Sequence, residues 1–201
     1  MGRGARIGEA TPTTMIEPSD LSHFSQPAAL RNGTPVLIRA IRPDDADRVR
    51  AAFHKLDAES IYTRFFSHKK DLSTEELGRL SGVDFSHAVV LVAAIGSGAN
   101  ERLIGGASYY VHDAADGARV AEIAFTVEEG SQGQGLSTQL MALMTEIARG
   151  QGIARFEAEV LAGNSAMLSV FQNSGLPMTK THEDGVVYVV LDLANPAPAG
   201  P

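Results

Sequence analysis

Residues 120–138 read VAEIAFTVEEGSQGQGLST and contain the change of pattern that decides the fold. The stretch 120–127 is apolar or β-branched apart from one glutamate, which is typical of a strand inside a sheet. Gly130, Gly133 and Gly135 then interrupt this pattern, and a glycine-rich turn between a strand and a helix exposes backbone N–H groups at the positive end of the helix. The stretch therefore predicts a strand, a turn that either binds an anion or only caps a helix, and a helix that begins directly after Gly135.

The sequence on both sides of this turn predicts an α/β (α+β) domain. The helix after the turn is amphipathic, because apolar residues recur at helical spacing in Leu136, Leu140, Leu143, Met144 and Ile147. Before the turn, three strands separated by turn residues predict an antiparallel meander. In chain order we expect strand 36–41, helices within 43–56, 59–66 and 73–80, strands 88–95, 103–111 and 120–127, the helix from 136 to about 150, strand 155–161, helix 165–173, and a hairpin of strands 176–181 and 186–193.

The composition is that of one globular domain, since the 201 residues are 44% hydrophobic and 20% charged. No apolar run approaches the roughly 18 residues that a membrane span requires, and the first residues lack the apolar centre of a signal peptide. A net charge of −7 opposes a generic surface for nucleic acid or an anionic membrane. We therefore expect a cytoplasmic protein that binds neither nucleic acid nor membrane, and a homodimer is left open.

The sequence also argues against a metal centre. Cysteine is absent, which excludes disulfides, thiolate metal ligands and a cysteine nucleophile. The histidines show no spacing that is typical of a metal site. We therefore expect no metal.

Proline placement predicts the domain boundaries. Six of the nine prolines lie in the first 33 or the last 7 residues, and these ends show no sustained periodicity. We therefore expect a flexible N-terminal segment over 1–33, one folded domain over 34–194 and a disordered C-terminal tail over 195–201.

Three phosphate-binding interpretations compete for the glycine turn. A Walker-type loop fails because no Lys-Ser or Lys-Thr pair follows the glycines. The spacing of Gly130, Gly133 and Gly135, with Glu159 about 24 residues later, superficially resembles a dinucleotide-binding loop. That loop belongs on the first strand of a βαβ series, whereas three antiparallel strands precede the turn here.

The third interpretation begins at Gln132, where QGQGLS resembles the acyl-CoA loop of the GNAT (Gcn5-related) N-acetyltransferase family, Gln/Arg-x-x-Gly-x-Gly/Ala. Ser137 stands where that pattern has Gly or Ala. The expected element order over 36–193 is also that of the GNAT fold, and Asn164, Phe171 and Gly175 match its Asn-helix-Gly segment. The resemblance implies a mixed, mostly antiparallel central sheet flanked by helices, with acetyl-CoA as cosubstrate and 34–194 as the acetyltransferase domain.

A narrower resemblance links the chain to bacterial Pat-type protein lysine acetyltransferases. It is carried by the segments 59–66, 121–127 and 159–167. It implies that Glu122 is the general base and that the acceptor is a protein lysine or, failing that, a small amine. Taken from the residues alone, Glu122 either has a task or a partner that offsets burial in an apolar strand, or it faces solvent.

The family resemblance also implies which residues hold the coenzyme, largely through main-chain groups. They are Phe125, Thr126, Val127, Gln132, Gly133, Gln134, Gly135, Leu136, Ser137, Thr138 and Asn164. The hydroxyls of Ser137 and Thr138 and the amide of Asn164 have ordinary helix capping as an alternative role.

Phe171 departs from the family pattern, because many members have at this position a tyrosine that protonates the departing thiolate. The thiolate then leaves unassisted or through water, or the chain is a non-catalytic acyl-CoA sensor or interaction domain. A basic and aromatic cluster over residues 64–70 is either a solvated face or a contact for the acceptor.

Overall fold

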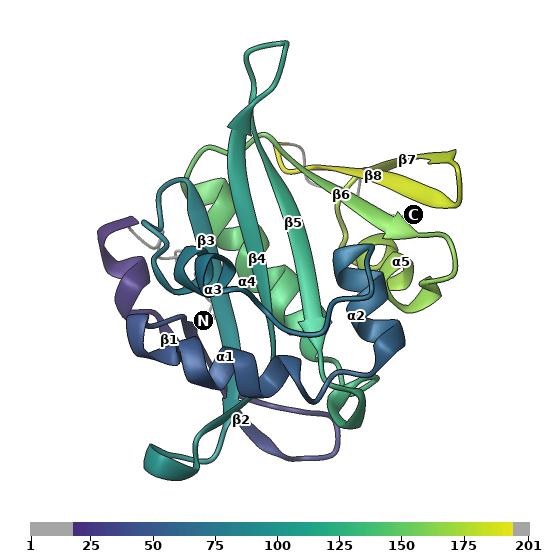
Figure 1. The fold of residues 1–201 in the computed structure, drawn as a ribbon. Helices are drawn as coiled ribbons and strands as arrows, with labels where there is room; N and C mark the ends of the chain where they lie inside the picture. Colours follow the sequence, from purple (N-terminus) through teal and green to yellow (C-terminus); the bar gives the residue numbers. More distant parts are fainter. Residues whose placement is uncertain (1–17, 195–201) are drawn as a thin grey trace, which may run out of the picture.

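The computed structural model describes residues 18–194. These residues form a single mixed sheet with helices on both faces (Figure 1). The strands are β1 (Ser25–Ala29), β2 (Pro35–Ala40), β3 (Ala88–Ile95), β4 (Arg102–Asp113), β5 (Arg119–Val127), β6 (Arg155–Leu161), β7 (Met178–Glu183) and β8 (Val186–Asp192). The α-helices are α1 (Ala46–Phe53), α2 (Ala58–Phe65), α3 (Thr74–Ser81), α4 (Leu136–Gly150) and α5 (Ser165–Gln172). Short 3₁₀ turns are η1 (Pro18–His23), η2 (Pro43–Asp45), η3 (Gly98–Asn100) and η4 (Glu129–Ser131).

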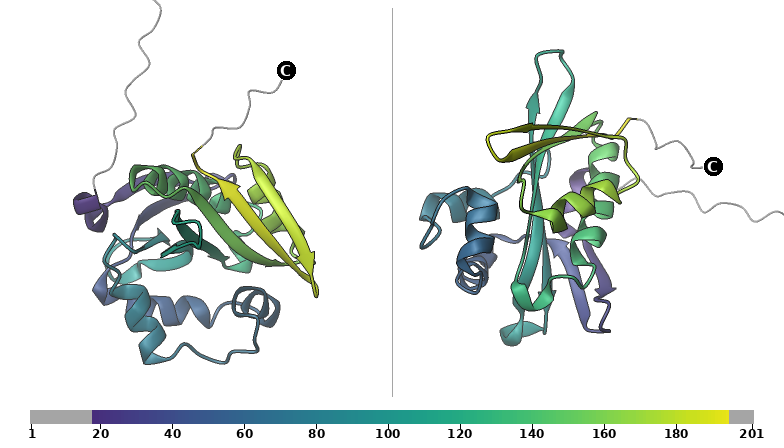
Figure 2. Two further views of the ribbon diagram at one scale, coloured as in Figure 1. Left: turned by 90° about the horizontal axis from the view of Figure 1, so that it is seen from above. Right: turned by 90° about the vertical axis from the view of Figure 1, so that its right-hand side faces the viewer.

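The strands follow the order β1-β2-β3-β4-β5-β6-β8-β7. The expected meander is confirmed, since β3, β4 and β5 pair antiparallel in succession. The one parallel pair among the described strands is β5 with β6. Helices α1, α2 and α3 cover one face of the sheet, and α4 and α5 cover the other (Figure 2). The fold class predicted from the sequence, with a mixed and mostly antiparallel sheet flanked by helices, is therefore confirmed.

The folded domain starts earlier than the boundary expected at residue 34. β1 pairs antiparallel with β2, and Leu21 and Leu30 are buried in the core with 0% and 5% of their surface exposed. The segment SQPAA of β1 has no apolar alternation, because it is an edge strand whose side chains are mostly exposed. Pro27 is tolerated there because an edge strand need not use every N–H for pairing. The expected flexibility of residues 1–17 and disorder of residues 195–201 lie outside the described residues.

The core forms where α4 packs against the sheet. The five apolar residues predicted for its inward face, Leu136, Leu140, Leu143, Met144 and Ile147, are each at most 8% exposed. Burying a side chain of this size stabilises the fold by roughly 1.5–3 kcal/mol. On the opposite face, Phe53, Leu72 and Leu77 make a smaller cluster beneath α1 and α3. The helices on both faces are thus fixed by apolar packing.

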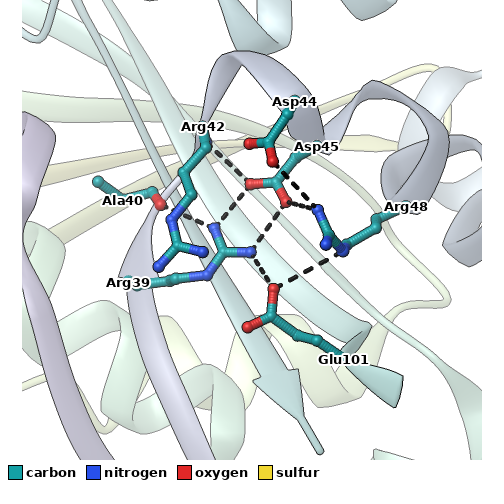
Figure 3. Close-up of polar contacts among 7 residues, drawn as sticks. All are labelled: Arg39, Ala40, Arg42, Asp44, Asp45, Arg48 and Glu101. Carbon is teal, nitrogen blue, oxygen red and sulfur yellow. Dashed lines mark hydrogen bonds and ion pairs between the residues drawn. The ribbon is translucent and has the colours of Figure 1, made fainter. Parts of the chain in front are cut away.

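A buried ion cluster fastens β2 to the start of α1 (Figure 3). Arg39 is 1% exposed and donates from Nη1 to Asp45 Oδ2 at 2.6 Å and from Nη2 to Glu101 Oε1 at 2.7 Å. Burial alone would raise the pKa of Asp45, but the hydrogen bonds from Arg39 and from the Arg42 amide hold that pKa below its ordinary value. The carboxylate therefore stays ionised in the core, with its charge paired.

Candidate active site

The centre of the site is a gap between two neighbouring strands. β5 and β6 pair only from Val120 opposite Arg155 to Glu122 opposite Glu157, although both strands continue beyond that point. The remainder of β6 pairs with β8 on its other side. The gap opens into a cleft of about 1060 Å³ that is lined by residues 123–127 of β5 and 158–161 of β6. A strand edge inside a cleft offers backbone N–H and C=O groups to a ligand.

The loop between β5 and α4 forms one end of this cleft. Gly133 and Gly135 have φ angles of 69° and 83°, in the left-handed region that favours glycine. Gly135 is the N-cap of α4, which has no side-chain cap. Within the described chain, the amide N–H groups of residues 133–138 have no hydrogen-bond acceptor. Consecutive free N–H groups at the positive end of a helix of fifteen residues can hold phosphate oxygens.

Nearly all the residues expected at the coenzyme line this cleft. They are Phe125, Thr126, Val127, Gln132, Gly133, Gly135, Leu136, Ser137, Thr138 and Asn164. Gln134 does not line it, and its carbonyl accepts a hydrogen bond from the amide of Arg31 in the β1–β2 connection at 3.0 Å. In the described structure, the hydroxyls of Ser137 and Thr138 make no capping hydrogen bond. The geometry therefore brings the predicted loop and strand residues to one place, except for Gln134.

Asn164 combines the two roles that the sequence left open, helix cap and cleft residue. Its Oδ1 accepts a hydrogen bond from the Met167 amide at 3.0 Å, which caps α5, and the residue also lines the cleft. The capping bond fixes the orientation of the side chain. Its amide nitrogen is the part that stays available to a ligand.

Glu122 is exposed, and it lies in the wall of the cleft rather than in the core. Of the two alternatives that the sequence left open for Glu122, the structure thus shows the one in which the side chain faces solvent. A carboxylate in the wall of an open cleft can exchange a proton with water. The sheet register places Glu122 opposite Tyr110 on β4 and opposite Glu157 on β6, so the three side chains share one face. A second cavity of about 340 Å³, beneath α1 and α3, also includes Glu122. The carboxylate therefore lies where the two hollows meet.

The lining of the cleft is rich in charge. The carboxylate residues in the lining are Asp57, Glu59, Glu122 and Glu159, and the arginines are Arg31 and Arg64. The guanidinium of Arg64 lies over the ring of Phe65, with its Cζ 5.2 Å from the ring centroid. Burial lowers the pKa of Arg64, against the opposing effects of Tyr110 and Glu122. The cleft lining thus contains four carboxylate residues and two arginines.

The basic and aromatic cluster of residues 64–70 divides in the structure. Lys69 donates to Glu76 at 2.6 Å, so its charge is paired. The ring of His68 stacks on that of Tyr62, with centroids 5.0 Å apart. Arg64, Phe65 and Phe66 line the cleft. Residues 64–66 of the cluster therefore lie where a ligand could contact them, whereas Lys69 forms an ion pair with α3.

Phe171 lines the cleft from α5 and is 1% exposed. Its ring packs edge to face against Phe125, with ring centroids 5.9 Å apart. The side chain supplies packing and no proton at this position.

Two contributions to the cleft were missed from the sequence. Ser60 and Asp57 of the α2 region reach the loop, since Gln132 Nε2 lies 3.4 Å from Ser60 Oγ and the Asp57 amide donates to Glu129 at 3.1 Å. Arg31, in a segment expected to be flexible, lies against Gly133. These contacts join residues far apart in the chain, and no local pattern marks them.

The fold and the site define the class of protein. A model described as the acetyltransferase (GNAT) family matches residues 54–176, and the chain belongs to this family. It is 31% identical over 168 residues to Acetyltransferase Pat of Mycolicibacterium smegmatis, a match that covers 83% of this chain and 48% of that protein. The chain thus spans about half the length of this curated relative.

Solved structures agree with this assignment. The GNAT domain of S. lividans PAT superposes with a TM-score of 0.76 and 34% identity, covering 85% of this chain and 98% of that one. The structure of YncA from Salmonella typhimurium, solved with its cofactor acetyl-CoA, has a TM-score of 0.62 at 17% identity, covering 79% of this chain and 94% of that one. This second likeness supports the fold alone.

Residues 18–194 lack two further features. No helix in that range is long and apolar enough to cross a membrane. No group of three or more His, Asp or Glu side chains there has a geometry that suits a metal ion.

Proposed function

We propose that the protein is an acetyl-CoA-dependent N-acetyltransferase in which Glu122 is the general base and the acceptor is a protein lysine. The observation that carries the proposal is the meeting of three features in one cleft: the gap between β5 and β6, the free amides of residues 133–138, and the carboxylate of Glu122. Each feature suits a different part of the same reaction.

The cleft has the groups that a CoA thioester needs. The free amides at the start of α4 suit the pyrophosphate, and the backbone of residues 125–127 at the open strand edge suits the two amides of the pantetheine arm. The thioester would supply an acyl group that is activated toward an amine. The chain has no cysteine to carry that acyl group, which favours direct transfer to the acceptor.

In this proposal Glu122 deprotonates the acceptor amine. An amine attacks only when it is neutral, so a base must remove a proton from the ammonium form. The exposed carboxylate accepts that proton directly or through one water, and passes it to solvent. Phe171 cannot protonate the departing thiolate, so the thiolate leaves without help from this side chain.

The charge of the cleft favours a cationic acceptor. Asp57, Glu59 and Glu159 line the cleft together with Glu122 and would attract an ammonium group. Tyr62 and Phe66 of the same lining are exposed by 40% and 38%. Exposed rings beside carboxylates suit the aliphatic arm and ammonium of a lysine on a protein surface better than a small polar amine.

The test is an acceptor screen with labelled acetyl-CoA, accompanied by calorimetry of acetyl-CoA binding. We expect binding, together with transfer to lysine in proteins or peptides that exceeds transfer to small amines. Absence of acetyl-CoA binding would overturn the proposed function. Binding without transfer to any acceptor would favour the non-catalytic acyl-CoA sensor, which Phe171 keeps as the second candidate.

A further inference from the structure

The connection between β1 and β2 lies against the glycine loop, although about one hundred residues separate them in the chain (Figure 1). The Arg31 amide donates to the carbonyl of Gln134 at 3.0 Å, and Arg31 Nη1 donates to the carbonyl of Gly133 at 3.3 Å. Gln139, in the first turn of α4, donates from Nε2 to the carbonyl of Ala29 at 3.0 Å. Three hydrogen bonds therefore fix this connection to the loop and to the start of the helix.

The side chain of Arg31 extends across the loop at the cleft. A Cβ placed on Gly135 would lie 3.4 Å from Arg31 Nε, so the guanidinium stem passes directly over the N-cap of α4. Arg31 is exposed and lines the cleft. The cation is thus held beside the free amides of residues 133–138 and remains open to solvent.

The charge of Arg31 is not neutralised within the described chain. No carboxylate there lies within ion-pair distance of its guanidinium, and the bond to Gly133 uses one of its five N–H donors. The other cationic residue of the lining, Arg64, interacts instead with Tyr110 and Glu122. Arg31 is therefore the one positively charged side chain that the described structure places at the loop end of the cleft.

We propose that Arg31 binds the phosphate groups of acyl-CoA, which makes the β1–β2 connection part of the coenzyme site. The inference rests on the proposed function and adds to it a residue outside the glycine loop. An arginine presents a planar fork of donors that matches phosphate oxygens, and charge-assisted bonds of this kind are roughly twice as strong as neutral ones. Because its backbone is already fixed on the loop, Arg31 loses little freedom when a phosphate binds.

The negative net charge of the chain makes the positive charge of Arg31 important for binding an anionic coenzyme. The net charge is −7, and the cleft lining contains four residues with carboxylates. A polyanionic coenzyme entering such a cleft is repelled unless positive charge lies at the phosphate end. The amides of the loop supply partial charges only, and Arg31 supplies a full one.

The test measures acetyl-CoA affinity by calorimetry for wild type, Arg31→Ala, Arg31→Lys and Lys180→Ala. Lys180 is exposed on β7 and outside the cleft lining, so its substitution removes the same charge at a distance. We expect Arg31→Ala to weaken binding by about 10- to 100-fold, as for a lost charged hydrogen bond. We expect Arg31→Lys to be intermediate and Lys180→Ala to match wild type.

Shortened ligands separate the phosphates. S-acetyl-pantetheine has no phosphate, so Arg31→Ala should bind it as wild type does. If the penalty of Arg31→Ala persists with acetyl-dephospho-CoA, the contact is with the pyrophosphate. If the penalty disappears with that ligand, the contact is with the 3′-phosphate. Either result supports the proposal.

Two results would overturn it. One is wild-type affinity of Arg31→Ala for acetyl-CoA. The other is an equal loss of affinity for acetyl-CoA and S-acetyl-pantetheine, which would mean that the substitution only distorts the cleft. In both cases wild type still binds acetyl-CoA and the proposed function stands, whereas no binding by wild type would remove the proposed function itself.

Discussion

Glu122 on β5 lies directly opposite Tyr110 on β4, and both residues line the smaller cavity beneath α1 and α3. Burial raises the pKa of the Tyr110 phenol, while the cations Arg64 and Arg79 act in the opposite direction. The phenol therefore stays protonated at neutral pH. The carboxylate of Glu122 and a phenol that keeps its proton are thus direct cross-strand neighbours.

Glu122→Gln should reduce kcat/KM for acetyl transfer by about 10²- to 10⁴-fold, the usual contribution of a general base. Acetyl-CoA affinity should stay close to that of wild type, because the loop and strand edge are unchanged. Steady-state kinetics and calorimetry measure the two effects separately. Glu159→Gln is the matched control, since it removes a second carboxylate from the same cleft lining. Wild-type turnover by Glu122→Gln would remove the proposed base.

Phe171→Tyr should raise kcat by less than about tenfold, well below the effect of a working general acid. The ring is buried against Phe125, and the proposed reaction lets the thiolate leave without a donor at this position. Rapid measurement of thiol release in single turnover tests this. A gain of a hundredfold, lost again above the pKa of the new phenol, would mean that the thiolate needs an acid that the natural chain lacks.

Ser73→Ala should lower the free energy of unfolding by about 1 kcal/mol, as for the loss of other N-caps. A capping box begins α3: Ser73 Oγ accepts from the Glu76 amide at 3.2 Å, and Glu76 Oε2 accepts from the Ser73 amide at 2.8 Å. Urea unfolding measures the change. Ser73→Thr should retain most of the stability, and an equal loss in both variants would contradict the capping role.

Glu76 should make this stabilisation depend on pH. The hydrogen bonds from Lys69 and from the Ser73 amide lower the pKa of Glu76 from 4.5 to about 2. A carboxyl whose pKa is lower in the folded state stabilises the fold above its unfolded pKa and loses that contribution as the pH falls through the folded value. The stability difference between wild type and Glu76→Gln should therefore be greatest above pH 4.5 and should shrink toward pH 2. A difference that is constant across this range would contradict the assignment.

The local parts of the fold could be predicted because their cause is local. Strands 88–95 and 155–161 were predicted with the bounds that the structure has. The first is a continuous apolar run and the second alternates between polar and apolar residues, and turn residues follow both. The capping box depends on two residues three positions apart. The glycine loop could also be predicted locally, because the positive φ angles at 133 and 135 favour glycine and the glycines are visible in the sequence.

The parts that the sequence did not reveal depend on partners far along the chain. Arg31 contacts a residue 102 positions away, and nothing in its own segment indicates that contact. β1 is an exposed edge strand without alternation, so its pairing with β2 leaves no pattern. The exposure of Glu122 depends on how fully other elements cover its face of the sheet, which the sequence of β5 does not show. Periodicity identifies elements, whereas the site is made by the packing between them.

Asp45→Asn should lower the free energy of unfolding by about 3–5 kcal/mol, because it leaves the buried charge of Arg39 with an incomplete set of partners. Arg39 keeps Glu101 at 2.7 Å, but Asp45 accepts two hydrogen bonds from it, at 2.6 and 2.9 Å. The asparagine side chain has one oxygen that can accept and an NH₂ group that cannot, so one of these two bonds and the negative charge are lost. The double variant Arg39→Met with Asp45→Leu should be less destabilised than the sum of the single variants, since no unpaired charge remains. A double-mutant cycle in guanidinium chloride measures this coupling. Acetyl-CoA affinity should stay unchanged throughout, because neither residue lines the cleft. Additive costs would mean that the two charges are stabilised independently, and that the cluster does not fasten β2 to α1 as a unit.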